Sequence, residues 1–117
     1  MSRPKKDLAN TIKQIDPKAF LGISREKWDT DNQIPPRLRP FFINLATLME
    51  ISRPIPENPQ VIDTGKFERA IVCQISGCTE DEFYENLEII CKTDALRKVG
   101  FTLYAINPAY IVYGVDE

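Results

Sequence analysis

The chain has 117 residues, of which 43% are hydrophobic, and its formal net charge at pH 7 is −2. This length is typical of a single domain, and the hydrophobic content excludes wholesale disorder. No apolar run approaches the ~20 residues that span a bilayer, and the basic start of the chain lacks the apolar core of a signal peptide. We therefore expect a cytoplasmic protein that does not bind a membrane.

The absence of certain residue types excludes several classes of enzyme. The sequence has no histidine, which removes Ser-His and Cys-His nucleophilic sites, histidine zinc ligands and the commonest general base near neutral pH. Neither a GxxxxGK[ST] phosphate loop nor a GxGxxG fingerprint occurs. Cys73, Cys78 and Cys91 match no zinc spacing, and their odd number favours reduced thiols; we expect Cys73 and Cys91 to pack in the core. The sequence thus predicts a binding protein rather than an enzyme, with no cofactor and no metal.

Charge is divided unevenly along the chain. Residues 1–40 carry nine Lys and Arg against five Asp and Glu, whereas residues 41–117 carry six against twelve. This split predicts that the N-terminal part, rather than the C-terminal part, would face a polyanion.

Residues 1–35 are expected to form a basic arm and a helical extension. Apolar residues between positions 8 and 15 recur at the spacing of one helix face. Asp16-Pro17 then favours a short helical turn over the residues that follow. Residues 22–36 are polar and predict a linker or an irregular wrap, in which Trp28 is either an exposed contact or, as we favour, an anchor against the core.

The strongest helical pattern covers residues 37–52. Its apolar positions form one stripe, made of Leu38, Phe41, Phe42, Leu45, Leu48 and Met49. The segment Arg53-Pro54-Ile55-Pro56 ends the helix, because proline cannot continue one. If the protein forms a homodimer, this helix is the expected contact between the two copies.

A short apolar strand at Val61-Ile62 precedes the next helix. That helix is predicted over residues 65–76, because its apolar positions lie on one side. Asp63 or Thr64 would cap its first turn.

The second helix of the pair is predicted over residues 80–93. Gly77 lies where helices commonly end in a left-handed residue. Thr79 and Glu82 then have the spacing of a capping box, which opens a new helix. The two helices therefore form a helix-turn-helix arrangement.

The end of the chain predicts a β-hairpin. Residues 96–99 and 102–106 are expected to be two strands around a tight turn at Gly100-Phe101. Residues 110–113 are again rich in β-forming residue types.

This order of helix, strand, helix, turn, helix and hairpin is that of a winged helix. We therefore predict an α+β fold, with a winged helix-turn-helix domain over residues 36–117 and an additional N-terminal helical segment over residues 1–35. Winged helices bind DNA in some proteins and other proteins elsewhere, so the fold alone does not decide the function.

Two C-terminal stretches carry a family resemblance. They are Leu96-Arg97-Lys98-Val99-Gly100 and the segment from Tyr104-Ala105-Ile106-Asn107-Pro108 to Gly114. They resemble the end of winged-helix plasmid replication initiators of the RepL-like family, in which a Tyr-x-Ile-Asn-Pro segment precedes a short apolar stretch and a glycine. The resemblance covers residues 65–114. It implies a DNA-binding protein of a plasmid, phage or other mobile element, acting in replication initiation and control or in transcription regulation.

Candidate contacts to double-stranded DNA are the basic residues of the arm, the long helix and the hairpin. They are Arg3, Lys5, Lys6, Arg37, Arg39, Arg97 and Lys98. The arm would lie in a minor groove, as homeodomain arms do, and the set would neutralise about four to six phosphates. The alternative for each residue is an ordinary solvated charge.

The second helix of the pair departs from the pattern of a DNA-binding protein. In helix-turn-helix proteins this helix enters the major groove, but here its outward positions are Glu80, Asp81, Tyr84, Glu85 and Glu88. Acids can accept a hydrogen bond from cytosine, yet several together would repel the phosphate backbone. The set is therefore either a solvated face that suits the helix dipole or the contact face for a basic protein partner, anchored by its tyrosine.

Overall fold

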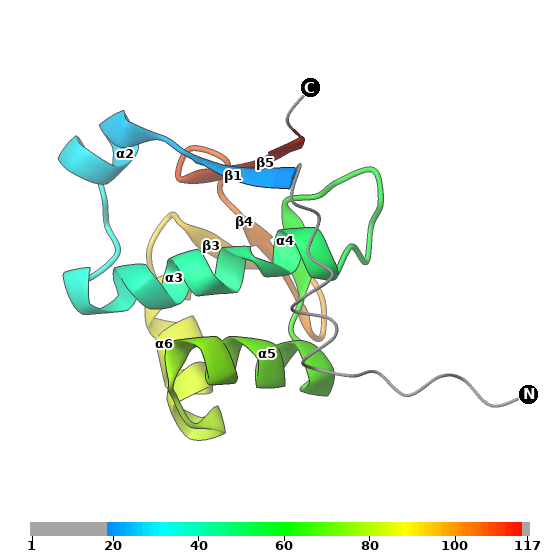
Figure 1. The fold of residues 1–117 in the computed structure, drawn as a ribbon. Helices are drawn as coiled ribbons and strands as arrows, with labels where there is room; N and C mark the ends of the chain where they lie inside the picture. The colour runs from blue at the N-terminus through cyan, green and yellow to red at the C-terminus, as the bar shows by residue number, and fades with distance from the viewer. Residues whose placement is uncertain (1–18, 116–117) are drawn as a thin grey trace, which may run out of the picture.

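The computed structural model describes residues 19–115 and, within them, the side chains of residues 22–113. Over this range the fold is α+β, as predicted (Figure 1). The helices are α2 (Arg25–Thr30), η1 (a 3-10 turn, Pro36–Leu38), α3 (Arg39–Ala46), α4 (Leu48–Ile51), α5 (Lys66–Ser76) and α6 (Glu80–Cys91). The strands are β1 (Ala19–Ile23), β2 (Val61–Asp63), β3 (Leu96–Lys98), β4 (Leu103–Ile106) and β5 (Ile111–Val115). None of the described helices has the length and apolarity needed to cross a bilayer.

The strands form two antiparallel sheets. β2, β4 and β3 make a three-stranded sheet in that order, in which Ala105 of β4 lies between Val61 and Arg97. β1 and β5 make a two-stranded sheet in which Ile23 pairs with Ile111. In Figure 1 the β1–β5 pair and the α5–α6 pair lie at opposite ends of the molecule, with α3 between them.

Strand β1 and helix α2 correct the expectation for the segment before residue 36. The sequence predicted a helical turn after Asp16-Pro17 and then a linker, whereas the structure has a strand at Ala19–Ile23 and a helix at Arg25–Thr30. The strand escapes local prediction because its hydrogen-bond partner, β5, lies at the other end of the chain. Ser24 caps α2, since its hydroxyl accepts a hydrogen bond from the backbone N–H of Lys27 at 3.4 Å.

Trp28 joins α2 to the main core, as predicted. Its ring lies 6.3 Å from that of Phe42 and 6.2 Å from that of Tyr110, measured between centroids. Ile34 is buried in the same hydrophobic cluster. Trp28 and Ile34 thus pack with the same core as α3.

The predicted long helix is interrupted at Thr47. The backbone N–H of Thr47 donates to the carbonyl of Asn44 at 3.2 Å, and its hydroxyl donates to the same carbonyl at 2.6 Å. This tight turn separates α3 from α4. The apolar stripe is buried as expected, in positions Leu38, Phe41, Phe42, Leu45, Leu48 and Met49. The chain's own core therefore covers the stripe.

The turn between α5 and α6 forms as predicted. Gly77 has φ of 69° and ψ of 30°, the left-handed conformation that glycine adopts without strain. The backbone N–H groups of Gly77 and Cys78 both donate to the carbonyl of Cys73, at 2.8 and 3.1 Å. Thr79 and Glu82 then form the reciprocal capping box that starts α6.

Candidate functional site

The tip of the β3–β4 hairpin is tied to the start of α5. The backbone N–H and the hydroxyl of Thr64 both donate to the carbonyl of Thr102, at 2.8 and 2.9 Å. The hydroxyl of Thr102 donates to the carboxylate of Asp63 at 2.7 Å. Asp63 and Thr64 thus hold the hairpin instead of capping α5 as predicted, and Gly65 is the N-cap. Figure 1 shows the hairpin turn beside the start of α5.

Phe101 at this tip is the most exposed of the large apolar side chains in the described residues. Its side chain is 92% exposed, and that of Val99 nearby is 44% exposed. Phe101 therefore contributes little to the core, and its ring is accessible to a contact outside the chain.

The two basic residues of the hairpin lie on opposite faces of its sheet. Side chains alternate along a strand, and Leu96 is buried in the core. Arg97 therefore points away from the core, whereas Lys98 lies on the side of α6. Burial raises the pKa of the Cys91 thiol on α6, and the nearby charge of Lys98 opposes that rise. The predicted pair is thus divided between two surfaces.

The predicted DNA contacts that precede the hairpin differ in their exposure and in their hydrogen bonds. Arg37 is exposed in η1, whereas Arg39 is half-buried and its Nε–H donates to the carbonyl of Ile34 at 3.1 Å. The three arm residues Arg3, Lys5 and Lys6 lie outside the described residues.

The other cations of the described chain divide into partnered and free ones. Lys27 and Arg69 form ion pairs, and Arg53 lies 4.2 Å from the ring centroid of Tyr113. Lys66 is exposed at the first position of α5 and, like Arg25, Lys92 and both hairpin cations, has no hydrogen-bond or ion-pair partner in the described residues. Sequence reasoning missed Lys66, because only the fold brings the start of α5 beside the hairpin.

The outward face of α6 is acidic, as predicted. Its exposed residues are Glu80, Asp81, Tyr84, Glu85 and Glu88. Arg69 of α5 donates to the carboxylate of Glu80 at 2.8 Å, and its guanidinium lies 5.3 Å from the ring centroid of Tyr84. Arg69 therefore contacts the first two turns of this face.

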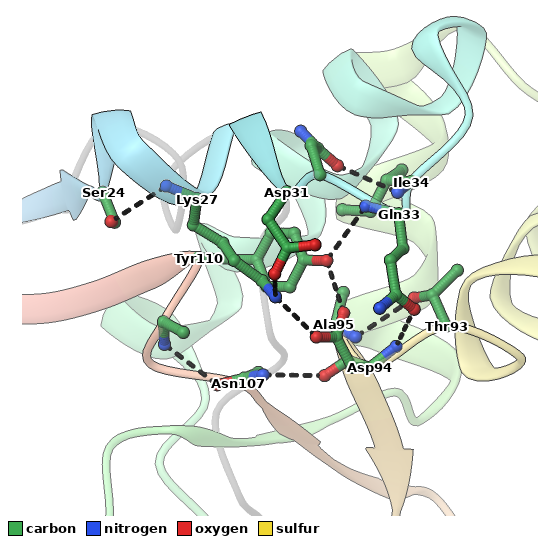
Figure 2. A network of polar contacts seen from close by, with 12 residues as sticks. Ser24, Lys27, Asp31, Gln33, Ile34, Thr93, Asp94, Ala95, Asn107 and Tyr110 are labelled. Carbon is green, nitrogen blue, oxygen red and sulfur yellow. Dashed lines mark hydrogen bonds and ion pairs between the residues drawn. The ribbon is translucent and has the colours of Figure 1, made fainter. Parts of the chain in front are cut away.

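A polar network joins α2 to the turn between α6 and β3 (Figure 2). The carboxylate of Asp94 accepts hydrogen bonds from the Lys27 ammonium at 2.6 Å and from the Tyr110 hydroxyl. Burial raises the pKa of Asp94, but these two hydrogen bonds outweigh it, and the pKa lies below its ordinary value. The bonds from Lys27 to Asp94 and Asp31 raise the pKa of the ammonium. The charges of this network therefore compensate one another.

A pocket of about 420 Å³ lies next to the network. Arg97 and Ala105 form one wall, on the outer face of the three-stranded sheet. Asn58 and Gln60, from the loop before β2, form another, and Asn107 closes the pocket from the turn after β4.

The three cysteines are free and half-buried. Cys73 and Cys91 pack against the core, as expected from their apolar neighbours. Burial, together with a hydrogen bond to Cys78, raises the pKa of Cys73 to about 11, so its thiol stays protonated and unreactive at neutral pH. The described residues contain no cluster of three side chains placed to hold a metal ion.

The structure thus brings Lys66, Lys98 and Phe101 to one end of the three-stranded sheet and places Arg97 on the outer face. No protein-family model, curated protein or solved structure matches the chain.

Proposed function

We propose that the chain is a winged-helix protein that binds double-stranded DNA through its β3–β4 hairpin and the start of α5. The element order α3, β2, α5, α6, β3, β4 and the strand order β2-β4-β3 support the winged-helix assignment. The hairpin is then the wing. Together with the resemblance of the C-terminal residues to RepL-like initiators, this favours replication control or transcription regulation of a plasmid or phage.

The observation that carries the proposal is the free state of the hairpin-end cations. Lys66 and Lys98 are exposed and have no partner in the described residues. A free cation can neutralise a phosphate and release its condensed counterion, which is the main source of sequence-independent affinity for DNA. Phe101 adds an apolar side chain of the kind that minor-groove proteins insert at base steps.

Helix α6 does not make the usual major-groove contact in this proposal. Its outward acids would lie against phosphates there, and the repulsion would remove much of the affinity. Arg69, the cation best placed to offset them, is already paired with Glu80. The duplex is therefore bound along the hairpin, with the outward face of α6 turned away.

Fluorescence anisotropy with a random-sequence duplex tests the proposal. We expect a dissociation constant of roughly 1–100 μM at physiological salt. Each of Lys66→Ala and Lys98→Ala should reduce the slope of log affinity against log salt by about 1. Arg25→Ala on α2 is the matched control, because Arg25 is also exposed and without a partner in the described residues. Absence of binding even at low salt would exclude the proposal.

A second candidate function is docking of a basic protein segment on α6. The observation that favours it is Tyr84, which is 47% exposed, held by Arg69 and flanked by acids. Aromatic anchors within a polar rim are typical of interface hot spots. A lysine- and arginine-rich peptide should then bind the wild-type chain and bind Tyr84→Ala or Glu85→Lys more weakly. Equal binding to all three proteins would remove this candidate.

A further inference from the structure

The pocket beside Arg97 has most of its hydrogen-bond acceptors already in use. The amide oxygen of Gln60 accepts from the backbone N–H of Tyr113 at 3.2 Å, and that of Asn107 accepts from the N–H of Ala109 at 2.9 Å. The amide oxygen of Asn58 accepts from the N–H of Gln60 at 3.2 Å. Each of these amide oxygens therefore already accepts one hydrogen bond from the protein.

The one carboxylate that lines the pocket is also committed. One oxygen of Asp94 accepts from Lys27 and the other from Tyr110. Asp94 forms no ion pair with Arg97, although both line the pocket. The charge of Arg97 is thus left uncompensated by the described residues.

The pocket does offer hydrogen-bond donors that no protein group uses. The guanidinium of Arg97 offers five N–H groups in a planar fork, and none has a partner in the described residues. The side-chain NH₂ of Asn58 also has no partner there. A cationic fork beside a neutral donor matches an oxyanion, above all phosphate, whose oxygens accept two parallel hydrogen bonds from arginine.

We infer that this pocket binds the phosphate group of an organic phosphate, with Arg97 as the bidentate donor and Asn58 as the second donor. The volume of about 420 Å³ falls within the range of small-molecule sites, roughly 300–1,000 Å³. Ala105, Ile106 and Pro108 supply apolar lining for the organic part. The phosphate comes either from a free mononucleotide-sized ligand or from a phosphodiester of bound nucleic acid, since both present the same oxygens.

Titration of the isotope-labelled protein with adenosine monophosphate and with inorganic phosphate, followed by NMR, tests the inference. We expect saturable shifts of the Arg97 Nε–H and the Asn58 amide at millimolar ligand. Arg97→Gln should weaken binding at least tenfold, as loss of a charge-assisted bidentate contact implies. Arg25→Gln on α2 is the matched control, because Arg25 is also exposed and has no partner in the described residues; it should change affinity less than twofold. Absence of saturable shifts, or equal loss in both variants, would overturn the inference.

Competition with a duplex then identifies the source of the phosphate. Displacement of adenosine monophosphate by the duplex assigns the pocket to a backbone phosphodiester. Simultaneous binding of both assigns it to a free ligand. Both outcomes support a phosphate site. The monophosphate titration needs no DNA, so failure of the pocket and failure of the DNA proposal are distinguished.

Discussion

The indole Nε1–H of Trp28 donates to the backbone carbonyl of Tyr110 at 3.1 Å, and the two rings meet edge to face at 85°. The same carbonyl accepts the backbone N–H of Ser24, also at 3.1 Å. Trp28 and Tyr110 lie near opposite ends of the described chain, so their contact joins its N-terminal and C-terminal segments. It fixes α2 against the turn that leads into β5.

Replacing Trp28 tests how much this contact stabilises the fold. Trp28→Phe keeps a ring but loses the hydrogen bond, and should lower the free energy of unfolding by about 1 kcal/mol. Trp28→Ala also loses the packing on Phe42 and Tyr110 and should cost about 3 kcal/mol. Urea unfolding followed by circular dichroism measures both, since the protein has one tryptophan and its fluorescence would be lost. Unchanged stability in Trp28→Ala would contradict the role of anchor.

The Asp94 carboxylate should make stability depend on acid pH. Its pKa in the folded protein lies below the ordinary 3.8, so its contribution is present above pH 3.8 and is lost as the pH falls through the folded value. Asp94→Asn should therefore be less stable than wild type at pH 7, and the difference should shrink towards pH 3. Urea unfolding at pH 7, 5 and 3 measures it. A constant difference across this range would show that the ionised carboxylate is not responsible.

Position 77 needs glycine because of its left-handed backbone conformation, and not because a side chain would lack room. Its φ is 69°, and a Cβ added there would meet no atom within 4 Å. Gly77→Ala should therefore cost about 1–2 kcal/mol from the left-handed backbone alone. Gly77→Asn should cost less, because asparagine tolerates this region better. Thermal unfolding of the two variants gives the comparison, and equal stability of Gly77→Ala and wild type would contradict the account.

Elements with local signals could be predicted from the sequence. The capping box at Thr79 and Glu82, the helix end at Gly77 and the turn at Gly100-Phe101 all depend on residues close together in the chain. Strand β1 could not be predicted, because it is defined by pairing with β5. The break at Thr47 was missed because a threonine within an apolar stripe leaves the helical period intact.

The candidate site was predictable only in part. The exposed positions of α6 can be predicted from its apolar stripe, and the same residues are exposed in the structure. The sequence places Arg97 and Lys98 together on the hairpin, whereas strand alternation separates their side chains onto two faces. Lys66 and the tie between Thr64 and Thr102 depend on tertiary contacts, which a linear pattern does not contain.

Chemical-shift mapping of the labelled protein with a random-sequence duplex at low salt tests the central claim most directly. We expect the largest shifts at Lys66, Lys98 and Phe101, and small shifts at Glu85 and Glu88 on the outward face of α6. Raising the salt should reverse these shifts, because phosphate contacts supply the affinity. Shifts centred on α6, or none anywhere in the chain, would contradict DNA binding through the hairpin.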